Sequence, residues 1–378
     1  MAVFPSATDI AIVGGGPAGA AAALTLRRYT GHACLLIDAG DYSAVRVGET
    51  VSPALPALLD YLGAGDALAG GACLAGDGPV AAWGQAGLIA APGPADPGGS
   101  LMLDRQRFDR ALASAAERAG ARLALRTRLR GAEVAARGGW TLRLEQDGGD
   151  FTVRARQVVE ASGRKAVFAR RTGAVVVAED RLIAYAACYR LAPGGEGSPR
   201  LLIEAVREGW WYAAPIPGSR QMVAYLTDAD LAAHGAVDQV YLAALARTRH
   251  IAARLAGAER LGPPLGHPAG SQSLQPCLGQ DWVAAGDAAR SFDPLSSLGI
   301  GHALASGIQA ARIVADRAAG GETLAAAYPA DIARIGREHE TRRRLLYAAE
   351  RRWPESRFWR RRAVAAAEPD RPVALADA

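Results

Sequence analysis

The feature that most constrains the fold is a glycine-rich stretch near the amino terminus, which reads DIAIVGGGPAGAAAALTLRR. Residues 10–13 are apolar and mostly β-branched, and the alanine-rich residues after the glycines have high helix propensity. This order predicts a strand, a tight turn and a helix. Three of the glycines have GxGxxG spacing: Gly14, Gly16 and Gly19. That spacing permits the turn, the close approach of a pyrophosphate to the backbone, and close packing of the helix against the strand.

The next apolar segment, ACLLIDAG, contains Asp38 at the end of a second predicted strand. A carboxylate at this place can accept hydrogen bonds from a ribose. A GxGxxG turn alone is weak evidence, because glycine-rich turns are common in loops. Here, however, the strand, the helix and the acidic residue occur in the expected order. We therefore predict a dinucleotide site in an α/β lobe.

Composition excludes several other classes of protein. With 378 residues, half of them hydrophobic, the chain can bury a large core and is expected to form about two interleaved lobes. The net charge of +5 is mild and all basic residues except Lys165 are arginine, so no nucleic-acid surface is indicated. The four cysteines lack CxxC or zinc-ligand spacing, so we expect neither disulfides nor a bound metal. Without a signal peptide or transmembrane segment, a cytoplasmic protein is expected.

Two further segments add to the nucleotide site. One reads VRVGET and contains Arg46 and Glu49; the other reads LDRQRFDRALASAAERAGA and is predicted to be a helix that begins near Arg105. The segments resemble those of the FAD-dependent monooxygenase and flavin-dependent halogenase superfamily, which carries an Arg-x-x-Phe-Asp helix near FAD. The resemblance implies non-covalently bound FAD in contact with Arg105, with Arg46 and Glu49 as further cofactor-binding candidates. A solvated helix-start residue is the alternative for Arg105.

A second glycine-bearing turn lies late in the chain, in the stretch WVAAGDAARSFDPLSSLGIGHALASGIQAARIV. Its pattern predicts a short strand that ends at Gly286, a turn and a helix. The stretch resembles the second FAD signature of the same superfamily. The resemblance implies that Asp287 binds the ribityl or phosphate region and that Pro294 lies beside the isoalloxazine. It also implies that Gly299 and Ile300 offer backbone N–H groups to the N1 and O2 edge of the flavin. The alternative is a plain helix N-terminus.

The resemblance implies an α/β fold in which a Rossmann-type FAD-binding lobe is interleaved with an antiparallel-sheet substrate lobe. The first lobe would be of the glutathione-reductase-like, monooxygenase type, and a C-terminal helical tail would follow. The FAD-binding domain is predicted to be discontinuous, at residues 1–75, 100–175 and 265–330. The substrate domain is predicted at residues 76–99 and 176–264, and the helical tail at residues 331–378.

Two differences between this chain and the halogenases indicate which branch of the superfamily it resembles. Halogenases that chlorinate tryptophan resemble this chain at GETVSP and DPLSSLGI, but they need a lysine roughly thirty residues after the GE pair. The only lysine here, Lys165, lies in another segment. Halogenases also carry a glutamate where this chain has Ser296, followed by a serine matched by Ser297. These departures favour hydroxylation, in which a flavin C4a-hydroperoxide delivers oxygen to an electron-rich ring and needs positioning, water exclusion and a proton donor.

The middle of the chain is predicted to shape the substrate pocket. Alternating apolar residues and the turns APGGEGSP and PIPGSR predict an antiparallel sheet. Within it, Trp210, Trp211 and Tyr212 could stack on an aromatic substrate, or they could be sheet core. Four residues near the second turn are catalytic candidates: His302, Asp293, Ser296 and Ser297. Either His302 or Asp293 could protonate or orient the oxygen adduct. The alternative for His302 is a histidine that is simply packed in the helix.

The tail, TRRRLLYAAERRWPESRFWRRR, interleaves arginine with tryptophan and phenylalanine. It could be a membrane-surface helix, a docking surface for an acidic protein, or a helix packed on the FAD lobe. The segment also resembles the tail of flavoprotein maturases, which hydroxylate a tryptophan within the precursor of quinone-cofactor oxidases.

The leading interpretation is an FAD-dependent monooxygenase of an electron-rich aromatic substrate, such as tryptophan or an indole, free or within a precursor peptide or protein. NAD(P)H is expected to be the ultimate reductant, bound directly or used by a flavin reductase partner, because no second dinucleotide fingerprint is present. One alternative is another reaction of the same fold, halogenation or double-bond reduction. The other is a protein that binds FAD and a partner without turnover.

Overall fold

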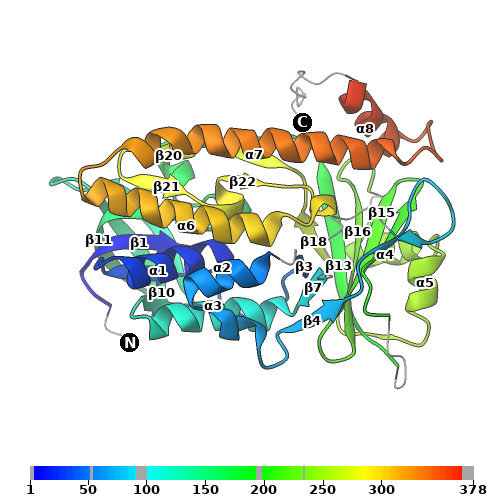
Figure 1. The fold of residues 1–378 in the computed structure, drawn as a ribbon, viewed down its shortest axis with the longest axis horizontal. Coiled ribbons are helices and arrows are strands. Elements are labelled where there is room, and N and C mark those ends of the chain that lie inside the picture. The colour runs from blue at the N-terminus through cyan, green and yellow to red at the C-terminus, as the bar shows by residue number, and fades with distance from the viewer. Residues whose placement is uncertain (1–3, 52–53, 91–99, 193–197, 233–234, 368–378) are drawn as a thin grey trace.

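The computed structural model describes residues 4–51, 54–90, 100–192, 198–232 and 235–367. These residues form a mixed α/β protein built on two large sheets, which lie at opposite ends of the molecule (Figure 1). The predicted α/β fold with two interleaved lobes and a helical carboxyl-terminal region is confirmed. Within the described residues, no helix is long and apolar enough to span a bilayer.

The first sheet is parallel at its centre. Its central strand β1 lies between β2 and β11, where Ile12 is paired with Leu36 on one side and with Val159 on the other. All three side chains are completely buried, as expected for short β-branched strands covered on both faces. The strands are β1 (Ala7–Val13), β2 (Cys34–Ile37), β8 (Arg122–Ala124), β9 (Thr127–Val134), β10 (Trp140–Gln146), β11 (Gly149–Glu160), β20 (Leu278–Gly279) and β21 (Trp282–Ala284).

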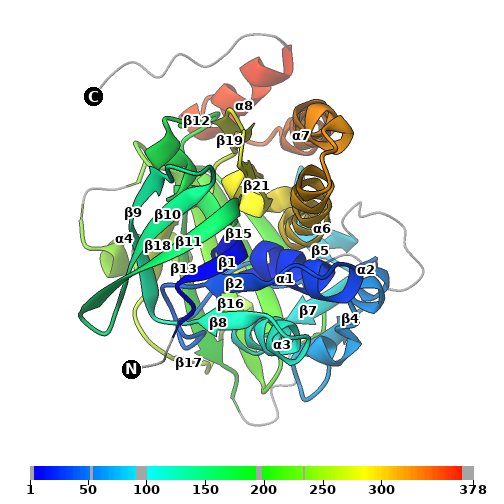
Figure 2. The same cartoon turned by 90° about the vertical axis from the view of Figure 1, so that its left-hand side faces the viewer.

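Helices lie on one side of β1, and on the other side β11 extends the sheet to β10 and β9 (Figure 2). The covering helices are α1 (Pro17–Tyr29), α2 (Leu55–Leu62), α3 (Arg105–Arg118) and α6 (Gly299–Ala318). Helices α1 and α6 cross closely because Gly307 has no side chain: a Cβ there would lie 2.2 Å from the Ala18 carbonyl oxygen. The helix that follows the first glycine turn therefore packs directly against the helix that follows the second.

The second sheet is largely antiparallel, as predicted. Its strands are β5 (Val80–Ala82), β6 (Ile89–Ala90), β13 (Leu182–Arg190), β14 (Leu202–Val206), β15 (Gly209–Ile216), β16 (Arg220–Asp228), β17 (Glu259–Arg260) and β18 (Leu265–Pro268). Helices α4 (Val237–Leu245) and α5 (His250–Arg254) contribute to the core on one face of the sheet. Of the two predicted turns, PIPGSR connects β15 to β16, whereas most of APGGEGSP lies outside the described residues.

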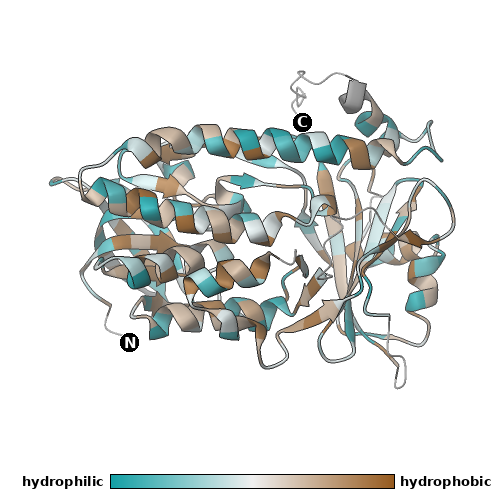
Figure 3. Ribbon diagram, viewed as in Figure 1, coloured by the Kyte–Doolittle hydropathy of each residue, from teal (hydrophilic) through white to brown (hydrophobic). Residues whose placement is uncertain are grey.

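Two three-stranded sheets and two carboxyl-terminal helices join the lobes. The small sheets comprise β3 (Thr50–Val51), β4 (Cys73–Gly76) and β7 (Ser100–Leu103), and β12 (Val175–Ala178), β19 (Gln272–Gln275) and β22 (Arg290–Ser291). Helix α7 (Thr323–Ala348) runs along both lobes to α8 (Arg357–Ala367) (Figure 1). Hydrophobic and hydrophilic residues alternate along α7 in Figure 3, and its buried residues recur every three or four positions, so one stripe of the helix faces the protein.

Candidate active site

The first glycine turn has the geometry that its spacing predicts. Gly14 has a φ of +111°, and a Cβ there would lie 2.1 Å from the Ala161 carbonyl oxygen. A Cβ on Gly19 would lie 1.8 Å from the Gly14 oxygen, so this glycine permits the close approach of helix and strand. Around Gly16 the protein itself leaves room, since the nearest atom is Arg46 Nη1 at 3.7 Å. Helix α1 has no side-chain cap, which leaves its first N–H groups open to a ligand.

Asp38 and Arg46 lie at the rim of this turn. The Asp38 carboxylate accepts hydrogen bonds from the Gly15 and Gly40 N–H groups, both at 2.7 Å. Arg46 lies 4.0 Å from Asp38 and 3.0 Å from the Asp109 carboxylate. The carboxylate predicted to bind a ribose is thus at the end of β2, where it also holds the backbone of the turn.

Arg105 is the first residue of α3 and is mostly buried. Its guanidinium forms two parallel hydrogen bonds with Asp109, each of 3.0 Å, and a third to the Val47 carbonyl at 2.7 Å. A bidentate pair of this kind fixes the plane of the guanidinium. Arg105 is therefore not a solvated helix-start residue; it anchors the segment that carries Arg46 and Glu49. Sequence reasoning missed Asp109, although its position four residues after Arg105 is a signal for such a pair.

Glu49 and Tyr212 meet between the lobes. Glu49 precedes β3, its side chain is buried, and its Oε2 accepts a hydrogen bond from the Tyr212 hydroxyl of β15 at 3.2 Å. Within the described residues, Oε1 has no partner. Burial raises the pKa of Glu49 to about 7, against the opposing effect of Arg105. A carboxyl group of this kind can hold or release a proton near neutral pH.

The second glycine turn lies beside the first, because β1 pairs with β11 and β11 pairs with β21. Gly286 has a φ of +60°, and its N–H donates to the Ser306 hydroxyl of α6 at 2.8 Å. Asp287 follows in the 3₁₀ turn η4 (Gly286–Ala288). Burial raises the pKa of its carboxyl, and Arg164 and Arg105 oppose that effect.

The turn before α6 is held by Asp293. Its Oδ1 accepts from the Leu295 N–H at 2.9 Å, which caps the single 3₁₀ turn η5 (Pro294–Ser296). The Ser296 hydroxyl donates to the Asp293 carbonyl at 2.9 Å, and Ser297 adopts a left-handed conformation with a φ of +53°. Ser296 is thus engaged within the turn itself. The predicted flavin contact Pro294 is its first residue.

Helix α6 begins with an open amino terminus. It has no side-chain cap at Leu298, and an added Cβ on Gly299 or Gly301 would have no heavy atom within 4 Å. Its first N–H groups, which include those of Gly299 and Ile300, have no intrahelical acceptor. The partial positive charge of a helix amino terminus favours a negatively charged ligand there.

Together the two turns fit FAD. Two uncapped helix amino termini offer N–H donors, Gly16 leaves space for a backbone-bound phosphate, and Glu49 supplies a buried carboxylate oxygen without a partner among the described residues. These features lie at the carboxyl ends of β1, β11 and β21, where ligands of open α/β sheets bind.

The predicted catalytic role of His302 finds little support in its surroundings. The side chain is 8% exposed and its ring packs edge-on against Phe292, with centroids 4.9 Å apart. Burial and, to a smaller extent, Arg290 lower the pKa of His302 to about 4, so the imidazole is neutral at pH 7. This placement favours the alternative of a packed histidine in α6.

Successive side chains of β15 point to opposite faces of the sheet, so the three aromatic residues predicted for the substrate pocket do not lie on the same face. Trp211 is completely buried on the sheet face covered by α4 and α5, where it stacks on Tyr225 at 4.9 Å and contacts Tyr241. It is sheet core, not a pocket residue. Trp210 is buried on the opposite face, and only Tyr212 is partly exposed and reaches a residue of the FAD lobe.

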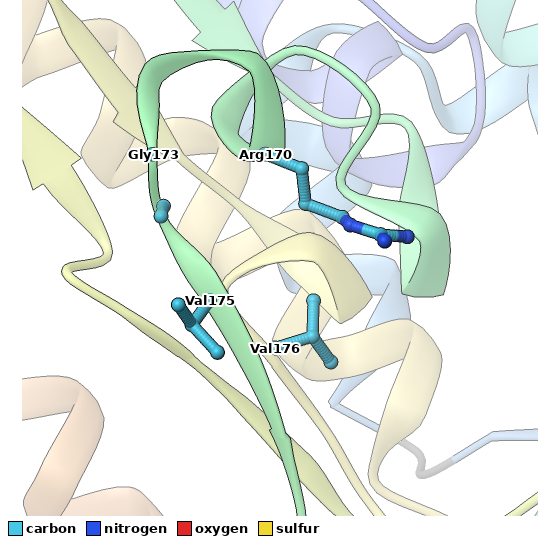
Figure 4. Close-up of a pocket in the computed structure, with 5 residues that line it drawn as sticks. Arg170, Gly173, Val175 and Val176 are labelled. Atoms are coloured by element: carbon cyan, nitrogen blue, oxygen red, sulfur yellow. The ribbon is translucent and has the colours of Figure 1, made fainter.

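A separate cavity of about 370 Å³ lies at the surface of the first lobe (Figure 4). It is lined by Arg170, Gly173, Ala174, Val175 and Val176, from the 3₁₀ turn η3 (Ala169–Thr172) to the start of β12. None of the predicted FAD-binding or substrate residues lines it, so it does not belong to the candidate site.

Comparisons with known proteins agree with this geometry. The sequence profile of an FAD binding domain matches residues 7–188, and that of the tryptophan halogenase family matches residues 98–377. LodB of Marinomonas mediterranea, named as an FAD-dependent oxidoreductase, is 32% identical over an alignment of 365 residues that covers 94% of this chain and 96% of LodB.

Solved structures show the same fold. The flavin-dependent halogenase CmlS superposes with a TM-score of 0.81 at 24% identity, over 95% of this chain and 68% of CmlS. QhpG, a peptidyl tryptophan dihydroxylase essential for tryptophylquinone cofactor biogenesis, superposes with a TM-score of 0.71 at 28% identity, over 94% of this chain and 78% of QhpG.

Proposed function

This chain belongs to the tryptophan halogenase family and is an FAD-dependent oxidoreductase, and we propose that it hydroxylates an electron-rich aromatic ring. The observation that carries the choice of hydroxylation over halogenation is the absence of a lysine outside Lys165. That residue is exposed on the 3₁₀ turn η2 (Gly163–Lys165). A halogenating relay through an amine therefore has no evident carrier in this chain.

The proposed substrate is the indole ring of tryptophan, free or within a precursor peptide or protein. Support comes from the similarity to QhpG, whose own substrate is a peptidyl tryptophan. Tyr212 is the one predicted pocket aromatic whose side chain is partly exposed and bonded to a carboxyl group at the lobe junction. A planar indole can stack on such a ring.

FAD, when bound and reduced, would supply the chemistry that activates dioxygen for oxygen transfer. The proposed contacts are the residues predicted from the two glycine turns and the segments beside them. They are Gly14, Gly16, Gly19, Asp38, Arg46, Glu49, Arg105, Gly286, Asp287, Pro294, Gly299 and Ile300. NAD(P)H is the proposed ultimate reductant, used directly or through a flavin reductase.

The chain's own proton-handling groups are proposed to be Glu49 and Tyr212. At neutral pH, Glu49 is near its midpoint, so its unpartnered Oε1 can hold a proton and give it up. The Tyr212 hydroxyl remains protonated, because burial and Glu49 raise its pKa well above the usual value. Tyr212 therefore acts as a hydrogen-bond donor that orients the Glu49 carboxyl.

The test is a product analysis with halide present. The FAD-loaded protein is given NAD(P)H, a flavin reductase, dioxygen and bromide, with indole, tryptophan or a tryptophan-containing peptide. We expect oxygenated products only, and Lys165→Ala should retain their formation within several-fold. A brominated product that disappears in Lys165→Ala would contradict hydroxylation and the surface role of this lysine together.

A further inference from the structure

The arginine- and tryptophan-rich tail is an internal part of the molecule. In α8, Phe358 and Trp359 are buried in the same core as Trp210 of β15 and Tyr347 of α7. Arg362 is 5% exposed; its guanidinium lies over the Phe358 ring at 3.5 Å and over the Tyr347 ring at 4.9 Å. The proposed function makes no use of this packing.

Arg362 is fixed from its other side by the second sheet. Its Nη2 forms an ion pair of 2.8 Å with Asp228, the last residue of β16, and both side chains are almost completely buried. A guanidinium that is paired and stacked at once has little freedom to move. Helix α8 thus fixes Tyr347 of α7 against the second sheet.

Tyr347 is the centre of a chain of hydrogen bonds that crosses the molecule. Its hydroxyl accepts from Trp210 Nε1 at 3.0 Å and donates to Asp293 Oδ2 at 2.8 Å. All three side chains are at most 3% exposed. Because the other oxygen of Asp293 caps η5, the chain of contacts leads from α8 to the turn that begins α6.

Other charged groups also face Asp293. Burial and Asp180 raise its pKa to about 6, whereas Arg343 of α7 and Arg362 of α8 oppose this rise. His339 of α7 interacts with the Asp293 backbone and is neutral at pH 7, because burial and Arg343 lower its pKa to about 4. The Tyr347 hydroxyl remains protonated, since burial and Asp293 raise its pKa well above the usual value.

We propose that Tyr347 is a positioning residue for the flavin turn: its hydroxyl, oriented by Trp210 and α8, holds the Asp293 carboxyl that caps η5. The carboxyl-terminal helices then complete the flavin site, although they lie at the end of the chain. This inference rests on the proposed placement of FAD at the amino terminus of α6 and not on the reaction that follows.

The test is a pH titration of the visible flavin spectrum of the FAD-loaded enzyme without aromatic substrate, because a nearby change of charge shifts flavin absorption. The titration is made in a Glu49→Gln parent, which serves as its wild type, because Glu49 would otherwise titrate near the flavin as well. In this parent, Asp293→Asn identifies the titrating group and should abolish the transition. Tyr347→Phe keeps the packed ring and removes one donor to the carboxylate, so the midpoint should rise by about one pH unit. Tyr328→Phe is the matched control, since that buried α7 hydroxyl donates to Ala284, at 2.7 Å, and should leave the midpoint unchanged.

A second variant covers the case in which Tyr347→Phe does not retain FAD. Trp210→Phe removes the N–H that orients the Tyr347 oxygen, together with part of the buried ring, and should move the midpoint in the same direction by a smaller amount. Two results would overturn the proposal. One is a transition that persists in Asp293→Asn. The other is a Tyr347→Phe or Trp210→Phe variant that retains FAD and has the same midpoint as the wild type or Tyr328→Phe. An absence of hydroxylation leaves this titration intact and speaks only against the proposed function.

Discussion

Buried carboxylates in this protein differ in what their oxygens contact. Both oxygens of Glu204 accept backbone N–H groups at the start of α5, from Arg249 at 2.7 Å, His250 at 2.9 Å and Ile251 at 2.8 Å. Glu49 has a single protein donor, and one oxygen has none within the described residues. A buried carboxylate without donors carries a desolvation cost that a functional site retains and a structural one avoids.

The first prediction concerns Glu49→Gln. Burial raises the pKa of Glu49 from about 4.5 to about 7, so its contribution to folding is fully present below pH 4.5 and is lost as the pH rises through 7. Glutamine does not ionise. In the FAD-free protein, the free energy of unfolding of the variant relative to the wild type should therefore grow between pH 5 and pH 8, by up to about 3 kcal/mol.

Chemical denaturation at several pH values measures this difference. Glu204→Gln is the control: its carboxylate accepts three N–H groups, so the substitution should destabilise the protein at every pH. A Glu49→Gln variant whose stability differs from the wild type by the same amount at pH 5 and pH 8 would contradict the raised pKa.

At the scale of single elements, the two helices that begin at the glycine turns are what the sequence predicted best. Strand, turn and helix follow one another within a few residues, so local periodicity and glycine spacing were sufficient. The hydrogen bond from Tyr212 to Glu49 joins residues 163 positions apart, and that from Tyr347 to Asp293 joins residues 54 apart. No local pattern encodes such a contact. The sequence also did not indicate which face of β15 lies toward the site, because either of the two adjacent tryptophans could have pointed there.

The glycines of the first turn are predicted to act in two different ways. Gly16→Val should keep the fold, because the nearest protein atom to a Cβ there, Arg46 Nη1, is 3.7 Å away, but it should weaken FAD binding at least about a hundredfold by filling the phosphate space. Gly19→Ala should lower the melting temperature of the FAD-free protein, since its Cβ meets the Gly14 backbone. Fluorescence titration with FAD and thermal melts of both variants measure the two effects. Full FAD occupancy in Gly16→Val would exclude this turn as the site.

At the scale of the whole molecule, the carboxyl-terminal tail joins the lobes through its charges as well as its rings. Arg352 pairs with the buried Glu350 at 2.6 Å and donates to the Ala82 carbonyl of β5 at 3.0 Å. Arg361 pairs with Asp228 and Asp230. These contacts favour a packed tail over the two other interpretations, but the tail packs on the second sheet and not, as expected, on the FAD lobe. Arg351 and Arg360 are exposed and remain candidates for docking an acidic precursor.

Two double variants separate packing from docking. Replacing Arg352 and Arg361 with serine removes the ion-pair partner of the buried Glu350 and one of the two arginines that pair with Asp228, and should cost about 3 kcal/mol of stability at any salt concentration. Replacing Arg351 and Arg360 should change stability by no more than about 0.5 kcal/mol. If a precursor docks there, the second variant should bind it more weakly than the wild type does. This loss of affinity should be larger at low salt than at high salt. Equal affinity at every salt concentration would leave the tail as scaffold alone.

The most direct test of the central claim is the source of the atom added to the substrate. The FAD-loaded enzyme is reduced, mixed with isotope-labelled dioxygen and a tryptophan-containing substrate in unlabelled water, and the product is analysed by mass spectrometry. The account predicts that labelled oxygen from dioxygen appears on the indole ring, with free tryptophan or with the peptide that the enzyme accepts. A ring that gains halogen, a substrate that gains only hydrogen, or oxygen that comes from water would contradict it.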